Sequence, residues 1–114
     1  MNAYKEYKGL PIVEGTVVAP IVIIDSSDFN VKNEEVMGKI AIIRVADPAI
    51  VLWLKSVVGL VVERGGVVSH GAILAREFNI PCIVGVNGIY DQDINGLMGS
   101  LYSNQGVLKI WLET

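Results

Sequence analysis

The sequence is poor in the residues that usually mark disulfide frameworks, metal sites and catalytic triads: its 114 residues include one cysteine and one histidine. With Cys82 alone, no intramolecular disulfide can form, and this cysteine usage fits the reducing cytoplasm. With His70 alone and no nearby Asp-x-Asp pair, a metal site or a Ser-His-Asp triad has little support. The composition therefore excludes a disulfide framework and predicts a domain that binds no metal of its own.

Basic runs and long apolar segments are also missing. The net charge is −3, from 12 acidic and 9 basic residues, and the basic stripe of a nucleic-acid-binding domain is not present. The longest wholly apolar run, residues 17–24, is far too short to span a membrane. Residues 1–8 lack the apolar core of a signal peptide. We expect a cytoplasmic domain with neither nucleic-acid nor membrane partners.

Apolar residues, in contrast, are abundant at 52% of the chain, which is enough for a substantial core. No repeat, low-complexity tract or linker interrupts the sequence, and 114 residues are the length of one domain. We therefore predict a single domain over residues 1–114.

Hydrophobic patterning predicts mostly strands. Residues 10–24 predict two short strands with a bend, because Gly15 and Pro20 interrupt the β-rich stretch. Residues 25–38 predict a surface loop or a short helical turn. Further strands are expected at residues 39–45, 57–62, 82–86, 97–102 and 107–111.

Two helices are expected between these strands. Asp47-Pro48 predicts the start of a short helix over residues 49–55, with the aspartate as its cap. A second helix is expected over residues 69–78, stopped by Ile80-Pro81 because a residue before proline avoids helical geometry. The order predicts an α/β fold, a mixed β-sheet sandwich with two or three short helices.

The segment suited to chemistry runs from a buried strand through Gly65-Gly66 to Ser69-His70 at the start of the second helix. A helix N-terminus offers free N–H groups and the positive end of the macrodipole, so it stabilises a phosphate without a basic residue. The glycine pair lets the backbone bend tightly and approach a bulky anion. Ser69 is expected either to cap the helix or to donate its hydroxyl to a phosphate oxygen.

His70 is suited to be a nucleophile at this position. The unprotonated imidazole is the nucleophilic form of histidine, because one ring nitrogen then carries a free lone pair. Neutral imidazole can attack phosphorus, and the helix end then holds the anionic product. The residues alone leave a second interpretation open. A lone histidine is usually a capping or surface residue, and strand–glycine–helix turns also occur as plain connectors.

This segment resembles the phosphohistidine swivelling domain, which is the mobile domain of PEP-utilising enzymes such as pyruvate phosphate dikinase, PEP synthase, Enzyme I of the sugar phosphotransferase system and rifampicin phosphotransferase. The family pattern is Gly-Gly-x-x-Ser/Thr/Cys-His, followed by Ala-Arg-Glu and Ile-Pro. The chain matches it without a gap at Gly65-Gly66, Ser69-His70-Gly71, Ala75-Arg76-Glu77 and Ile80-Pro81. The likeness extends over almost the whole chain, including Asp47-Pro48 and the closing residues 106–110.

The resemblance implies a swivelling β/β/α domain in which His70 is phosphorylated, supported by Gly65, Gly66, Ser69 and Gly71. It implies an ATP-grasp nucleotide-binding domain or protein as phosphoryl donor, and a PEP-, pyruvate- or other acceptor-binding domain as recipient. ATP, PEP and Mg²⁺ are expected on those partners, and no cofactor on this domain. Because the chain has no nucleotide loop and no acidic Mg²⁺ cluster, we expect it to be part of a dikinase or phosphotransferase system and not a complete enzyme.

Two functional hypotheses follow. In the first, the domain takes a phosphoryl group on His70 from an ATP- or PEP-using partner and delivers it to an acceptor site. In the second, it is a non-catalytic binding or regulatory domain that retains the swivelling fold. Ala46 and Val68 bear on this choice, because many family members carry threonine at both positions.

The remaining residues can be sorted by position. Arg64, beside the glycine pair, is the better candidate for touching phosphate or a partner site. Arg76 lies about 240° around the helix from His70, which favours an ion pair or docking contact over a phosphate clamp. Cys82 is expected to be a small core residue and not a reactive thiol. Leu74 and Phe78, at positions i and i+4, are expected in the core.

Overall fold

The computed structural model describes residues 3–112, and this range contains eight strands and two α-helices. The strands are β1 (Tyr4–Lys8), β2 (Leu10–Val13), β3 (Thr16–Ile23), β4 (Ile40–Ile43), β5 (Gly59–Val62), β6 (Cys82–Val84), β7 (Met98–Tyr102) and β8 (Val107–Trp111). The helices are α1 (Asn33–Val36) and α2 (His70–Phe78). Four 3-10 turns connect them: η1 (Pro48–Leu52), η2 (Leu54–Ser56), η3 (Ile89–Asp91) and η4 (Ser103–Gln105).

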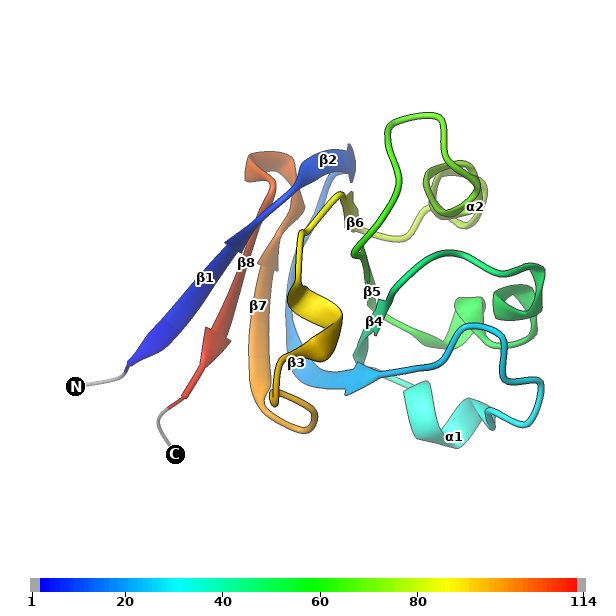
Figure 1. Cartoon of the computed structure of the whole chain (residues 1–114), viewed down its shortest axis with the longest axis horizontal. Coiled ribbons are helices and arrows are strands. Elements are labelled where there is room, and N and C mark those ends of the chain that lie inside the picture. Colours follow the sequence, from blue (N-terminus) through cyan, green and yellow to red (C-terminus); the bar gives the residue numbers. More distant parts are fainter. Residues whose placement is uncertain (1–2, 113–114) are drawn as a thin grey trace.

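The strands form two packed layers, and the chain passes from one layer to the other at two places. The order is β1-β8-β7-β3-β4-β5-β6-β2, antiparallel from β1 to β3 and parallel from β3 through β6. At one of these places β3 pairs with β7 and then with β4. At the other, Gly9 joins β1, which pairs with β8, to β2, which pairs with β6. Helices α1 and α2 cover the outer face of the parallel strands as a third layer (Figure 1). This confirms the expected β/β/α architecture with a mixed sheet.

Alternation along the parallel strands builds two cores. In β4, Ile40 and Ile42 face the space between the two sheets, while Ala41 and Ile43 face the helices. All four are fully buried, and burying one isoleucine side chain stabilises a fold by about 1.5–3 kcal/mol. Strand β5 follows the same pattern, which explains why its β-branched run contains no polar residue. The parallel sheet is thus packed on both faces, with α2 on its outer side.

Two strand predictions need correction. The strand β1 was not predicted, because its sequence YKEYK is charged and almost wholly exposed at the edge of the sheet. The predicted break at Pro20 is wrong, since β3 runs through it without interruption. Pro20 lies where β3 stops pairing with β7 and begins pairing with β4. A residue without an N–H donor is tolerated at such a change of partner.

Both predicted helices are found in position, but only the second is an α-helix. Asp47 does cap a helical turn, since its Oδ1 accepts the Ala49 N–H at 2.9 Å. The helix expected over residues 49–55 is, however, two consecutive 3-10 turns, η1 and η2. Helix α2 ends at Phe78 because Asn79 adopts a left-handed conformation with φ 53°, so the chain leaves the helix before Pro81 acts.

Candidate functional site

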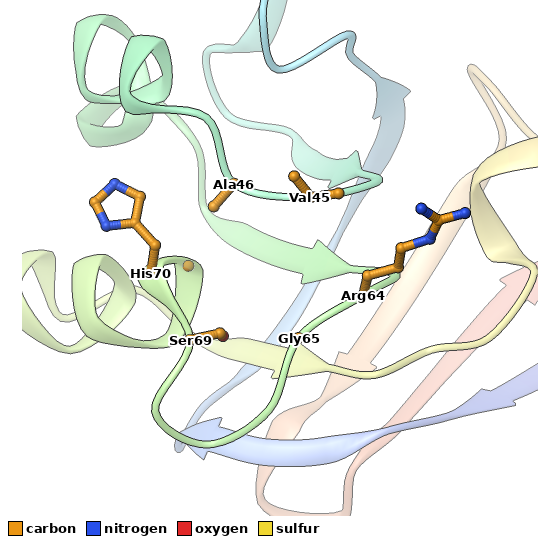
Figure 2. A pocket seen from close by; sticks show the side chains of 7 residues that line it. Val45, Ala46, Arg64, Gly65, Ser69 and His70 are labelled. Carbon is orange, nitrogen blue, oxygen red and sulfur yellow. The ribbon is translucent and has the colours of Figure 1, made fainter.

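A pocket of about 250 Å³ opens at the carboxyl ends of the parallel strands β4 and β5, beside the first turn of α2 (Figure 2). The carboxyl edge of a parallel sheet is where α/β folds commonly bind ligands. Residues from three segments line the pocket: Val45, Ala46, Arg64, Gly65, Ser69, His70 and Gly71. The structure therefore brings together every predicted site residue except Gly66.

His70 is the first residue of α2 and is exposed. In Figure 2 its imidazole stands clear of the helix, on the side that faces Ala46. The N–H groups of His70, Gly71 and Ala72 have no acceptor within residues 3–112, as expected for the first turn of a helix. The imidazole and three unpaired donors thus share one end of α2.

Ser69 occupies the N-cap position but does not cap the helix with its side chain. Its hydroxyl donates to the Gly66 carbonyl oxygen at 2.7 Å, and its own N–H donates to the same oxygen at 3.1 Å. The capping hydrogen bond that we offered as one alternative is therefore not formed. Ser69 instead closes the loop between β5 and α2, with its hydroxyl hydrogen already bonded to the Gly66 carbonyl oxygen.

The three glycines differ in what requires them. Gly65 has φ 130°, and a Cβ there would lie 2.8 Å from Ser69 Oγ. A Cβ on Gly71 would lie 3.2 Å from the Ala46 Cβ, so this glycine lets the first turn of α2 pack closely against the end of β4. A Cβ on Gly66 would meet nothing within 4 Å. Of the predicted glycine pair, only Gly65 is required by a close contact. Gly71, in the first turn of α2, is required as well.

Arg64 lines the pocket but its guanidinium is turned away from His70 (Figure 2). The side chain is 70% exposed, and its Nε lies 3.9 Å from Glu63 Oε1. Arg76 lies on the exposed face of α2 and is not among the residues that line the pocket.

Cys82, Leu74 and Phe78 have the packing that the sequence predicted. Cys82 is fully buried in β6. Burial raises the pKa of its thiol to about 12, an effect that the positive charge of Arg76 only partly offsets. The thiolate is the reactive form, so this thiol is inert. Leu74 is buried and Phe78 packs against the same core.

A charged cluster behind the pocket was missed by the sequence analysis. Glu63 is only 7% exposed; its Oε2 accepts the Tyr90 N–H at 3.1 Å, and its Oε1 lies 3.4 Å from Arg44 Nε. Arg44 also donates to Asp91 Oδ1 at 2.6 Å and lies 4.6 Å from the centre of the Tyr90 ring. The one signal in the sequence was a carboxylate directly after a wholly apolar strand.

Two further observations concern residues 3–112 only. No group of three or more His, Cys, Asp or Glu side chains in this range is arranged to hold a metal ion. None of the helices in it has the length and apolar character needed to cross a lipid bilayer.

Comparison with known proteins shows the family of this chain. The family model described as "PEP-utilising enzyme, mobile domain" matches residues 36–106, which is more than half of the chain and includes the whole segment from β4 through α2. The chain therefore belongs to the family of mobile domains of PEP-utilising enzymes.

The names of the relatives in this family refer to different substrates. The chain is 31% identical over 103 residues to a rifampicin phosphotransferase of Bacillus cereus, covering 90% of this chain and 11% of that one. It is 32% identical over 111 residues to a phosphoenolpyruvate synthase of Pyrococcus furiosus, covering 90% of this chain and 13% of that one. The chain thus spans about a tenth of the length of the curated relatives it matches. In them, the matching segment is one part of a much longer protein.

A solved structure supports the same assignment. The fold superposes on an NMR structure of an Enzyme I protein with a TM-score of 0.59 and 26% identity, covering 70% of this chain and 34% of that one.

Proposed function

We propose that this domain is a phosphoryl carrier. His70 takes a phosphoryl group from an ATP- or PEP-using partner and delivers it to an acceptor site elsewhere. The observation that carries the proposal is the position of the chain's one histidine: it is the first residue of α2, beside three N–H groups without acceptors and facing an open pocket.

The proposed phosphoryl transfer uses the imidazole of His70 and the N-terminus of α2. A neutral imidazole nitrogen of His70 attacks the phosphorus of the donor and forms a P–N bond. The bond from phosphorus to the leaving oxygen of the donor breaks, and its electron pair stays with that oxygen. The transferred group is anionic, and the N-terminus of α2 supplies backbone donors and a favourable dipole for it. Reversal of the same step passes the group to an acceptor.

The donor and the acceptor are expected on other domains. An ATP-grasp domain would use ATP and Mg²⁺, and a separate domain would bind PEP, pyruvate or a different small acceptor. The relatives favour this arrangement because the matching segment is a small part of each of them. The names of those relatives differ in their substrates, so the acceptor stays a prediction of class only. A cytoplasmic location is likewise proposed, from the single buried cysteine.

One observation favours the second hypothesis, a binding or regulatory domain. The pocket wall opposite His70 presents the Ala46 methyl group, where a threonine would add a hydroxyl donor. Beside the pocket, Val68 is 81% exposed and Ile73 is 45% exposed, as an apolar protein-binding surface would be. This hypothesis predicts that His70 is never modified.

Intact mass spectrometry separates the two hypotheses. The domain and its His70→Ala variant would each be incubated with ATP and Mg²⁺, or with PEP, in the presence of cell lysate as the source of partners. The carrier predicts addition of one phosphate that is acid-labile, base-stable and missing from the variant. An unmodified wild-type domain that remains folded with both donors would contradict the proposal.

A further inference from the structure

We propose that Glu63 is a positioning residue that competes with the phosphoryl group for Arg64, and so weakens the hold of the pocket on phosphate. This inference rests on the proposed function of His70 and adds the residue that regulates how tightly the site keeps its cargo. It comes from the charged cluster behind the pocket, which the mechanism at His70 does not use.

Glu63 is anchored where it can influence the bend. It directly follows β5 and precedes Arg64 and Gly65. The Tyr90 N–H holds Oε2 at 3.1 Å, which leaves Oε1 facing the guanidinium groups. A carboxylate that is only 7% exposed needs such partners, because an unpaired buried charge is strongly destabilising.

Arg44 is the fixed partner in this cluster. It donates to Asp91 at 2.6 Å, lies over the ring of Tyr90 and has its Nε 3.4 Å from Glu63 Oε1. Arg44 therefore has one hydrogen bond, one further ion pair and one ring contact, whereas Arg64 has a single ion pair within residues 3–112. Arg44 lines a neighbouring pocket and not the one beside His70.

Arg64 is the movable partner. Its one ion pair is with Glu63, at 3.9 Å, among the salt bridges of the described residues, and its side chain is 70% exposed. An ion pair of this length, with its arginine exposed to solvent, contributes little stability. The same residue lines the pocket of His70. A phosphate group can accept two hydrogen bonds from one guanidinium, which is a stronger interaction than the 3.9 Å contact with Glu63.

The balance of charge explains why the competition matters. Glu63 and Asp91 together offset Arg44 and Arg64, so the cluster is close to neutral while His70 is unmodified. When an anion enters the pocket, Arg64 can turn toward it, but only by leaving the carboxylate of Glu63. This opposing attraction lowers the affinity for phosphate, and a carrier needs a site from which its cargo can leave.

Titration with inorganic phosphate tests this directly on the unmodified domain. Amide NMR would give phosphate affinity for the wild type, Glu63→Gln, Arg64→Ala and the double variant. Glutamine keeps an oxygen for the Tyr90 N–H but removes the competing charge. We expect Glu63→Gln to tighten phosphate binding roughly two- to fivefold, the range that corresponds to a weak, solvent-screened ion pair. Arg64→Ala should abolish that gain in the double variant.

Asp91→Asn is the matched control, since it removes the same charge from Arg44 and not from Arg64. It should leave phosphate affinity unchanged. An equal gain from Asp91→Asn would overturn the inference, because any loss of negative charge would then suffice. A gain that persists in Glu63→Gln with Arg64→Ala would overturn it too.

The wild type supplies a readout that does not depend on how well Glu63→Gln folds. On addition of phosphate, the Nε–H resonance of Arg64 should shift and that of Arg44 should not. A silent Arg64 resonance at phosphate concentrations that shift the Gly71 amide would contradict the inference. Neither experiment requires His70 to be phosphorylated, so a failure of the proposed function would be seen separately, in the intact mass.

Discussion

Gly65 and Ser69 are in such close contact that a Cβ on Gly65 would lie 2.8 Å from Ser69 Oγ. The serine hydroxyl is held there by the Gly66 carbonyl oxygen, so it cannot move aside without losing a hydrogen bond. The bend that delivers His70 to the start of α2 therefore depends on a glycine at 65 and a hydroxyl at 69.

Replacement of Gly65 by alanine should destabilise the domain. The position combines φ 130° with the close contact to Ser69, and strain of this kind costs about 1–3 kcal/mol. Urea unfolding followed by circular dichroism measures the loss. Gly66→Ala is the control, because a Cβ there meets nothing within 4 Å. A larger loss from Gly66→Ala than from Gly65→Ala would contradict the described bend.

Replacement of Ser69 by alanine should weaken the loop without removing the histidine. A lost hydrogen bond of this type lowers the free energy of unfolding by about 0.5–1.5 kcal/mol. Ser69→Thr keeps the hydroxyl and should retain most of the stability. The two variants are compared by the same urea measurement, and equal destabilisation by both would argue against a role for the bond to Gly66.

Replacement of Ala46 by threonine should lengthen the lifetime of the phosphorylated form. The new hydroxyl would face the pocket and could donate to the phosphoryl group. One such bond corresponds to a roughly threefold to tenfold slower loss of phosphate. Ala46→Val adds the same bulk against Gly71 without a donor, so it is the control. The lifetime is followed by phosphorus NMR, and equal lifetimes for the two variants would exclude a hydroxyl effect.

Cys82 should make stability depend on alkaline pH. The thiol has its ordinary pKa of 9.0 in the unfolded chain, and burial raises this pKa to about 12 in the folded domain. A raised folded-state pKa means that its contribution is complete below pH 9 and is lost as pH rises toward 12. Relative to Cys82→Ala, the wild type should lose about 1.4 kcal/mol of unfolding free energy per pH unit in that window. A constant difference between the two proteins from pH 7 to pH 10 would contradict the described burial.

Much of the fold could be predicted from the sequence because its strongest patterns are local. The apolar run of β5, the turn at Gly65 and the helix starting at His70 follow one another directly along the chain. Strand β1 was missed because an exposed edge strand rich in charge has no apolar pattern to reveal it. Its partner β8 lies at the opposite end of the sequence.

The site was predicted less completely, for a different reason. The glycine pair, Ser69 and His70 lie within six residues, so a motif could identify them. The hydroxyl of Ser69 was assigned to the helix or to phosphate, whereas a backbone oxygen three residues earlier accepts it. Glu63 meets Tyr90 and Arg44 only through the tertiary fold. Contacts of that kind leave no trace in local spacing.

The central claim is that His70 both receives and delivers a phosphoryl group, and a pulse–chase of radiolabelled phosphate tests it most directly. The domain would be labelled with PEP or ATP and lysate, repurified, and then mixed with fresh lysate and candidate acceptors without donor. We predict that label reaches the wild type but not His70→Ala, and that it leaves faster with active lysate than with boiled lysate. A domain that takes no label, or that loses it at the same rate in both lysates, would contradict the carrier function.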